Sequence, residues 1–418
     1  MTNSLVPPAG PQRVLALAQL TNAVGDGAYL VTSAFYFTDV VGLSPARVGL
    51  GLTLGWAVGS VAGVPLGRLA DRRGPRGTAV LLALAAGIGV AAFLFVRGFL
   101  PFVLAACAYA AAQSGLGAAR QSLLAGLVSA EERTGASAYL QSAFNAGLAV
   151  GAGLGGLAIQ AGTRAAYLGV FAMDAATFVV CAGVLLRLPS VAARGGERRG
   201  AGGAGKRRGL GVVGDRRYVA VTVLNTVLLL RMPLLSLGLP LWIAERTQAP
   251  AWLVSALFVL NTGAVMVFQV RMARGVTGVG SAVRAVRRSG WVMLAACAVF
   301  ALSAGASPWV AAGVLVAGAA LQVVAEMGQS AGSWQLSFDL APADRVGEYQ
   351  GFFGTGVTVA RTSGPLVLTT LLLGWGTAGW LLLGAATLVA SYAMGPVAQR
   401  WGAACRAQVR QPHPALVS

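Results

Sequence analysis

Long apolar runs constrain this chain more than any other feature of its 418-residue sequence. Only 11% of the residues are charged, whereas soluble globular domains carry about 25%, so charge cannot cover the surface of the fold. An apolar run of about 20 residues is long enough to cross a lipid bilayer as a helix. We therefore predict an all-α membrane protein with lipid as its solvent. Twelve such runs are present, at 12–38, 46–69, 76–96, 100–128, 136–161, 165–187, 218–243, 251–272, 284–304, 308–336, 346–373 and 377–399.

The twelve predicted transmembrane helices fall into two sets of six, separated by a stretch of different composition. Residues 189–217 are rich in glycine and arginine and nearly free of large apolar residues, which is typical of a flexible linker. We predict an N-terminal six-helix bundle over 1–188, a basic cytoplasmic linker over 189–217, and a C-terminal six-helix bundle with a cytoplasmic tail over 218–418.

The turn between the second and third predicted spans is strongly basic and indicates the orientation of the chain. Its sequence over residues 63–77, GVPLGRLADRRGPRG, holds four arginines and one carboxylate. Lys and Arg in short loops resist translocation, so this turn is predicted to lie in the cytoplasm. With twelve spans, both termini and most of the 31 basic residues then also lie in the cytoplasm. The predicted location is the cell (plasma) membrane, which the chain crosses many times.

The two predicted halves repeat short sequence features at similar positions. Ser44-Pro45-Ala46 precedes the second span, and Ala249-Pro250-Ala251 precedes the eighth. Glu132-Arg133-Thr134-Gly135 precedes the fifth span, and Asp344-Arg345-Val346-Gly347 precedes the eleventh. A repeat that spans half of the chain is typical of a transporter built from a duplicated half. We therefore predict that the two bundles are pseudo-symmetric.

Six charged residues are predicted to lie inside the membrane, where a central charge costs about 2.5–3.5 kcal/mol on insertion scales. Four of them lie one each on the first, fourth, seventh and tenth spans: Asp26, Arg120, Arg231 and Glu326. Each half thus holds one acid and one base, and we predict that these form an ion pair in each half. The other two are Asp174, expected to serve packing or hydrogen bonding, and Arg361, which could line the cavity or pair with a neighbouring carbonyl group.

Polar residues recur at helical spacing beside these charges and indicate the wall of a cavity. They are Asn22 and Tyr29 on the first span, Gln113 on the fourth, and Gln322 and Gln329 on the tenth. The candidate residues for proton coupling or for the substrate cavity are therefore Asp26, Arg120, Arg231, Glu326, Asn22, Tyr29, Gln113, Gln322 and Gln329.

The basic turn also resembles a known family signature. Its residues Gly67-Arg68-Leu69-Ala70-Asp71-Arg72-Arg73-Gly74-Pro75-Arg76 are similar to the loop between the second and third helices of the major facilitator superfamily. Through the six-plus-six layout, the basic central linker and the repeat, the resemblance extends over the whole chain. It implies two six-helix bundles around a central cavity, lined mainly by the first, fourth, seventh and tenth helices, and transport by alternating access.

The resemblance gives the basic turn a role as a cytoplasmic gate. It implies that Asp71 contacts the N-terminus of the eleventh span, at Arg345 to Gly351, where the helix dipole favours a carboxylate. Gly67 and Gly351 would let the two helices approach closely. The alternative is that the turn serves only as a topology anchor. The gate candidates are Gly67, Asp71, Arg72, Gly74 and Arg76.

The fifth span carries glycines that resemble the antiporter motif of this superfamily. They are Gly147, Gly151, Gly155 and Gly156, and Ala152 stands where that motif has proline. Small residues at this spacing also let membrane helices pack closely. Packing alone, and packing together with an antiport role, therefore both remain open.

The sequence offers little material for catalysis or for binding a metal. His413 is the only histidine, and the four cysteines lie far apart. Gly200 to Lys206 fit the start of a phosphate-binding loop, but Arg207 stands where that motif needs Ser or Thr. We predict that the protein is not an enzyme and has neither a metal site nor a cofactor. The net charge of +18 lies in short loops between apolar runs, so nucleic acid is not a predicted partner.

These features together predict a secondary active transporter. The first hypothesis is proton-coupled export of a small organic compound, such as a drug or antibiotic, with Asp26 or Glu326 carrying the proton. Alternatively, these charges are permanent ion pairs that hold helices together. The alternative function is import or symport of a small nutrient on the same fold, and a membrane enzyme or receptor is a third. The predicted partners are the substrate, protons and the lipid bilayer, and the chain is expected to be a monomer.

Overall fold

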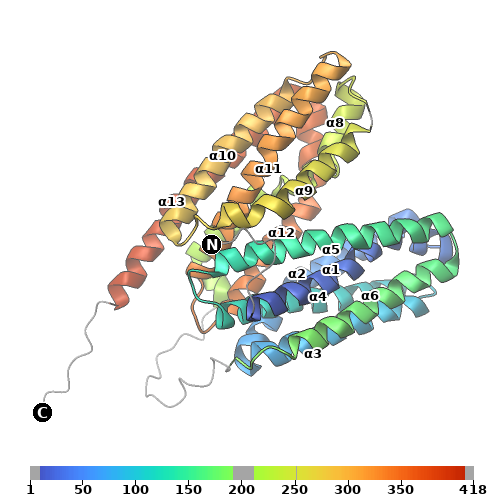
Figure 1. Cartoon of the computed structure of the whole chain (residues 1–418), viewed down its shortest axis with the longest axis vertical. Helices are drawn as coiled ribbons and strands as arrows, with labels where there is room; N and C mark the ends of the chain where they lie inside the picture. The colour runs from blue at the N-terminus through green and yellow to red at the C-terminus, as the bar shows by residue number, and fades with distance from the viewer. Residues whose placement is uncertain (1–9, 192–210, 251, 410–418) are drawn as a thin grey trace, which may run out of the picture. The chain divides into compact units, whose positions relative to one another are not determined.

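All regular secondary structure in the described part of the chain is helical (Figure 1). The computed structural model describes residues 10–191, 211–250 and 252–409, apart from the side chains of residue 45 and residues 399–409. Most of the predicted linker, His413 and the stretch Gly200 to Lys206 therefore lie outside the described residues. The α-helices in these ranges are α1 Pro11–Phe35, α2 Pro45–Arg73, α3 Pro75–Ala92, α4 Phe99–Leu127, α5 Arg133–Ala161, α6 Arg164–Leu185, α7 Arg216–Leu229, α8 Gly238–Arg246, α9 Leu253–Ala273, α10 Val279–Ala301, α11 Pro308–Asp339, α12 Val346–Thr369 and α13 Gly376–Val409.

Short 3-10 and π-helical segments extend or connect several of these helices. The π-helical segments η1 and η6 directly follow α1 and α12, and the 3-10 segments follow α3, precede α7 and link α7 to α8. Their bounds are η1 Tyr36–Val40, η2 Phe93–Phe95, η4 Gly211–Gly214, η5 Met232–Leu234 and η6 Thr370–Gly374.

Eleven helical segments in the described ranges are long and apolar enough to cross a membrane. They correspond to eleven of the twelve predicted spans, and the all-α prediction is confirmed. The exception is α10, which spans 23 residues but contains Arg284, Arg287 and Arg288 in its first half. These three charges lower the apolar character of the helix without breaking it.

The seventh predicted span is not one continuous helix. The chain over 218–243 divides into α7, the 3-10 turn η5 and α8. Pro233 lies in the turn, and proline has no backbone N–H to donate to the preceding helical turn. Arg231 lies directly before η5, two residues beyond the last residue of α7, and so is not in the middle of a helix.

Helix boundaries follow from local capping chemistry in several places. Asp215 accepts hydrogen bonds from the backbone N–H groups of Arg217 at 3.2 Å and Tyr218 at 3.3 Å, and so caps α7. Gly74 separates α2 from α3 with φ of +99°, a value that favours glycine. Pro75 then occupies the first position of α3, where the missing N–H costs nothing.

The chain forms two compact units. Unit 1 comprises 1–205, 262–271 and 342–358, and unit 2 comprises 206–261, 272–341 and 359–418. Parts of α9 and α12 belong to each unit. The predicted domain boundaries at 188 and 218 stay a prediction.

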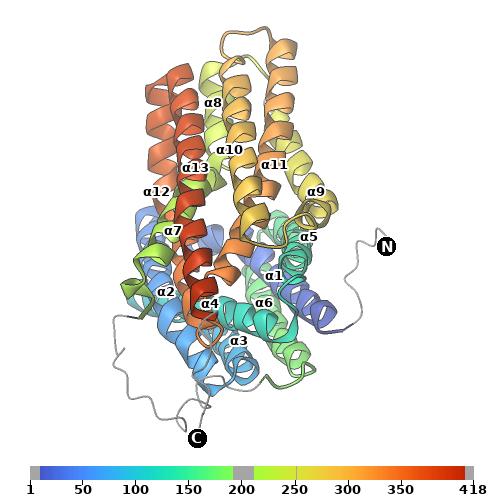
Figure 2. The same ribbon diagram turned by 90° about the vertical axis from the view of Figure 1, so that its left-hand side faces the viewer.

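Unit 1 is built around close contact between α1 and α5, which run side by side in Figure 1. Gly147, Gly151 and Gly155 of α5 face the backbone of α1, and a Cβ at Gly151 would collide with the carbonyl oxygen of Val24. These glycines therefore let the helices approach to backbone contact. In unit 2, α10 packs on α11 and α13 (Figure 2).

Candidate functional site

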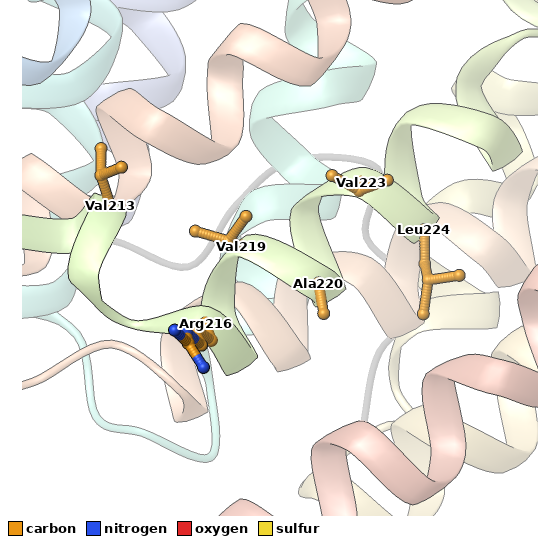
Figure 3. A pocket seen from close by; sticks show the side chains of 6 residues that line it. All are labelled: Val213, Arg216, Val219, Ala220, Val223 and Leu224. Carbon is orange, nitrogen blue, oxygen red and sulfur yellow. The ribbon is translucent and has the colours of Figure 1, made fainter.

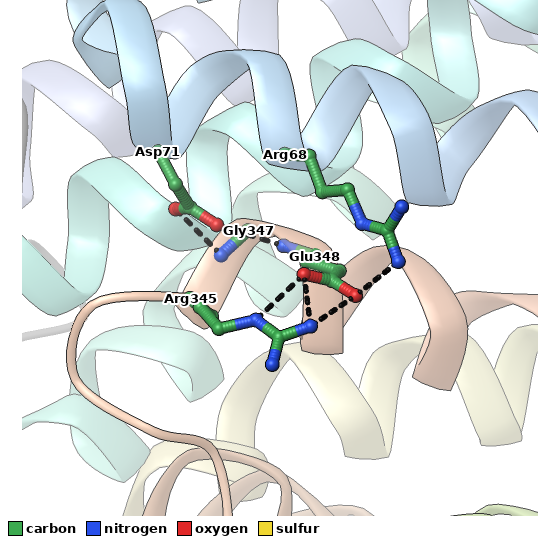
Figure 4. Close-up of polar contacts among 5 residues, drawn as sticks. All are labelled: Arg68, Asp71, Arg345, Gly347 and Glu348. Carbon is green, nitrogen blue, oxygen red and sulfur yellow. Dashed lines mark hydrogen bonds and ion pairs between the residues drawn. The ribbon is translucent and has the colours of Figure 1, made fainter. Parts of the chain in front are cut away.

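Asp71, at the end of α2, binds the N-terminus of α12 within unit 1 (Figure 4). Its Oδ1 accepts a hydrogen bond from the backbone N–H of Gly347 at 2.9 Å, and Oδ2 accepts one from that of Glu348 at 3.0 Å. The Ser122 hydroxyl of α4 donates to Oδ1 at 2.9 Å. The first N–H groups of a helix have no partner within that helix, so the buried carboxylate satisfies donors and complements the helix dipole.

Glu348 extends this contact with two arginines (Figure 4). Arg68 of α2 donates to its carboxylate at 2.7 Å, and Arg345 donates twice at 2.8 Å. The sequence interpretation marked the region Arg345 to Gly351 but did not identify Glu348. Its spacing of three residues from Arg345 is the signal that could have found it, because residues at i and i+3 lie on one helix face.

Paired glycines bring the backbones of α2 and the first half of α12 together. A Cβ at Gly67 would collide with the Gly347 carbonyl oxygen, and one at Gly351 would collide with that of Gly63. The remaining gate candidates, Arg72, Gly74 and Arg76, make none of the hydrogen bonds described for Asp71. Arg72 is exposed, and Arg76 donates to the carbonyl oxygen of Leu188 at 2.7 Å. We name Asp71, Glu348 and the two arginines that bind Glu348 the gate cluster.

Glu348→Gln is expected to destabilise the gate cluster by about 1 kcal/mol, because Arg68 and Arg345 keep about 40% of their side-chain surface exposed. The helix N-terminus itself keeps its hydrogen bonds to Asp71. Thermal unfolding of the purified protein should show a small loss, which 1 M salt should largely abolish because it screens partly exposed pairs. A loss that salt does not reduce would contradict this account.

Asp26 of α1 is held by uncharged donors in unit 1. Its carboxylate accepts hydrogen bonds from Asn22 at 2.6 Å, from the Tyr109 hydroxyl at 3.0 Å and from Gln113 at 2.9 Å. Tyr109 was not among the predicted residues, although it lies four residues before Gln113 on the same face of α4. The Asp26 side chain remains partly exposed, whereas Asn22 is buried.

Asp26 and Arg120 do not form the predicted ion pair in the described structure. Arg120 instead donates a hydrogen bond to Gln19. Arg120 lies seven residues beyond Gln113 on α4, and Gln19 lies seven residues before Asp26 on α1. Seven residues of helix rise about 10 Å, so the two contacts occupy different depths. Alignment of the two halves of the sequence placed Asp26 and Arg120 on the expected helices but could not show that their contacts lie at different depths.

The corresponding pair in unit 2 is present. Arg231 Nη1 lies 3.2 Å from Glu326 Oε1, and Asn261 donates to the other carboxylate oxygen at 3.1 Å. Arg231 also donates to Gln329 Oε1 at 2.7 Å. The side chain of Arg231 is 6% exposed and that of Glu326 is 26% exposed, so the acid is the more accessible partner.

A chain of hydrogen bonds continues from Gln329. Its Nε2 donates to Asn225 Oδ1 at 2.9 Å and to the Ser333 hydroxyl at 2.8 Å, which in turn donates to Asn225 at 2.7 Å. Gln322, about two helical turns away, is buried, and its Oε1 has no hydrogen-bond partner among the described residues. Asn225 was missed because it stands alone in an apolar run.

The remaining candidates lie elsewhere. Tyr29 is buried and packs its ring against Phe93, Tyr109 and Phe171, with centroids 5.5–5.9 Å apart. It therefore belongs to the aromatic core of unit 1. Arg361 is exposed on α12.

Two hollows occur within unit 2. The larger, of about 480 Å³, lies along η4 and α7 (Figure 3). Its lining is apolar except for Arg216, and it includes none of the predicted site residues. The smaller, of about 10 Å³, includes Arg231 and Gln329 in its wall. We place the candidate residues in two separate polar clusters, one around Asp26 in unit 1 and one around Arg231 in unit 2, because the larger hollow offers a ligand almost no polar partner.

Comparison with known proteins connects this geometry to one family. The family model described as Major Facilitator Superfamily matches residues 15–365. No curated protein sequence matches the chain. Among solved structures, the human organic anion transporter MFSD10 (TETRAN) is similar with a TM-score of 0.69 and 18% identity, over 92% of this chain and 100% of that one.

Two further solved structures share the fold. A bacterial homologue of the iron transporter ferroportin, in an outward-facing state, has a TM-score of 0.71 and 17% identity, over 94% of this chain and 99% of that one. The proton:xylose symporter XylE, bound to 6-bromo-6-deoxy-D-glucose, has a TM-score of 0.67 and 14% identity, over 91% and 93%. At such low identity these similarities show the fold and do not extend to substrates.

Proposed function

Because this chain belongs to the major facilitator superfamily of membrane transporters, we propose that it exports a small organic compound in exchange for protons. The family and the fold indicate a transporter rather than an enzyme. The observation that carries the finer proposal is the setting of Asp26. Its three hydrogen-bond partners are all uncharged, so it can gain or lose a proton without breaking an ion pair.

Glu326 has a different role in this proposal. It is paired with Arg231 and hydrogen-bonded to Asn261, so protonation would leave a buried guanidinium without its counter-charge. We assign coupling to Asp26, and positioning or substrate contact to the Arg231–Glu326 pair. The partly exposed Glu326 oxygens would meet the polar part of the compound.

The orientation in the membrane is part of the same proposal. The Arg-rich end of α2 and the start of α3 favour a cytoplasmic position for the gate cluster. With the predicted even number of spans, both termini then lie in the cytoplasm of a cell whose plasma membrane holds the protein as a monomer.

Asp26→Asn is expected to abolish proton coupling. We would express the full chain in a drug-sensitive bacterial strain, screen lipophilic compounds for raised resistance, and reconstitute the protein in liposomes with a pH-sensitive dye. Addition of a compound found in the screen should release protons with the native protein, and at least tenfold fewer with Asp26→Asn. Compound movement without any proton movement in the native protein would overturn the proposal.

A matched control separates coupling from binding. Glu326→Gln should weaken binding of the compound while each transported molecule still moves protons. If Glu326→Gln removes proton movement and Asp26→Asn keeps it, the two assignments must be exchanged.

The second candidate function is import of a polar nutrient. The network of Asn225, Gln329 and Ser333 beside Arg231 favours it, because amide and hydroxyl groups suit a hydrophilic solute. Uptake of labelled polar solutes by the same liposomes, driven by an inward proton gradient, would support this function and exclude export.

A further inference from the structure

Asp174 is a buried carboxyl for which the proposed mechanism has no role. It lies at the middle of α6, in a predicted span, and its residue is fully buried. The Thr177 hydroxyl donates to its backbone oxygen at 2.7 Å and lies 3.5 Å from Oδ1. Oδ2 has no hydrogen-bond partner among the described residues. An ionised carboxylate in this position would be an uncompensated charge in the membrane interior, which is costly.

The side chain of Asp174 lies against α1 at Gly25, the residue before Asp26. A Cβ at Gly25 would collide with Asp174 Oδ1 and with the Thr177 hydroxyl, so the helix backbones are in close contact there. Asp26 and Asp174 are near enough to interact electrostatically, and Tyr29 and Tyr109 are within electrostatic range of both. The two carboxyls therefore form one cluster.

One other charge, that of Arg120, acts on Asp26 at this point. Arg120 is itself hydrogen-bonded to Gln19. The helices α3 and α5, which also pack on α6, offer only groups in their first two turns: Arg76, Arg133 and Tyr139. Arg76 and Arg133 donate to backbone carbonyl oxygens.

We propose that Asp26 and Asp174 share one proton, which Asp174 holds in the conformation described here. The proposal rests on the proton coupling proposed above. Three donors stabilise the carboxylate of Asp26, whereas an oxygen without a partner favours the neutral acid at Asp174. Two adjacent carboxylates cannot both ionise without mutual repulsion, so the pair holds a single negative charge.

The side chains of Asp26 and Asp174 differ in solvent exposure, so we assign them different roles. Asp26 is partly exposed and can exchange its proton with water, whereas Asp174 is buried and keeps its proton away from water. Transfer breaks the O–H bond of Asp174 and forms one at a carboxylate oxygen of Asp26, and the negative charge moves to Asp174. The net charge of the pair is unchanged until Asp26 releases the proton.

Infrared spectroscopy of the purified full-length protein at neutral pH tests this assignment without a substrate. The native protein should show a protonated-carboxyl C=O band that exchanges slowly in D₂O. Asp174→Asn should remove that band completely, while Asp26→Asn and Glu326→Gln should keep it. Native and Asp174→Asn spectra that agree in this region would overturn the proposal, as would loss of the band in Asp26→Asn alone.

A second pair of variants tests the proposal even if Asp174→Asn does not fold. Gly25→Ala places a methyl group against Asp174 Oδ1 and should shift the band, whereas Gly153→Ala, whose Cβ meets none of the described atoms within 4 Å, should leave it unchanged. An unshifted band in both variants would count against Asp174. The two proposals can fail separately. If the band belongs to Asp174 but no protons move in liposomes, only the proposed transport function is contradicted. If protons move and the band is absent, only the proposal that Asp26 and Asp174 share a proton is contradicted.

Discussion

Asp71→Asn is expected to lower the transport rate by at least tenfold while leaving the affinity for the transported compound largely unchanged. Asn presents one oxygen and one NH₂ group to two backbone N–H donors, so one of the hydrogen bonds to Gly347 and Glu348 is lost. A hydrogen bond to a charged group contributes about 1.5–3 kcal/mol, and each 1.4 kcal/mol is about a factor of ten in an equilibrium. The equilibrium constant for the bound arrangement of α2 and α12 therefore falls about tenfold or more.

The consequence for transport follows from the place of α12 in the chain. Its first half belongs to unit 1 and its second half to unit 2. The gate cluster thus fixes one end of a helix that both units share. A transporter that populates this state tenfold less often completes its cycle correspondingly less often, whatever the occupancy of the binding site.

The measurement is initial-rate transport in liposomes together with equilibrium binding of the compound found in the resistance screen. Ser122→Ala removes one of the three hydrogen bonds to Asp71 and should give a smaller loss. Arg73→Gln, an exposed neighbour at the end of α2, should leave the rate unchanged. A large loss of affinity in Asp71→Asn would place the binding site at the gate cluster and contradict its role as a gate.

Sequence reasoning succeeded where a residue type is forced by its local setting. Asp71 could be placed at the start of α12 because the family loop and the helix dipole both require a carboxylate there. Eleven of the twelve spans could be predicted because apolar runs of bilayer length have few other uses. The two breaks in this pattern, at Pro233 and at the arginines of α10, were visible in the sequence but were outweighed by the apolar run around them.

Partners across helices were harder to predict. Arg120 was assigned to Asp26 because both lie on cavity helices, but a sequence gives no relative depth for helices far apart in the chain. Tyr109, Asn261 and Gln19 are single polar groups in apolar runs, and such residues serve packing as often as binding. Asp174 was assigned a packing or hydrogen-bonding role for the same reason, and the structure places its side chain against Gly25, the residue before Asp26.

Gly151→Ala is expected to destabilise unit 1 by about 1–3 kcal/mol, the usual cost of overpacking a filled interior. The added methyl group would collide with the Val24 carbonyl oxygen on α1, two residues before Asp26. Helix α1 must then move away from α5, which shifts Asp26 relative to Tyr109 and Gln113. We expect a lower unfolding temperature and a tenfold or greater loss of proton-coupled transport.

Gly156→Ala separates the two interpretations of the glycine motif. Gly156 lies on the same helix, but a Cβ there meets none of the described atoms within 4 Å. If the motif acts by packing α5 on α1, this variant keeps both the native unfolding temperature and the native transport rate. A native unfolding temperature with a reduced rate would instead assign the motif a direct role in antiport. Both substitutions add one methyl group to the same helix, so they change its helix propensity equally. A difference between them is therefore due to the surface that the methyl group contacts.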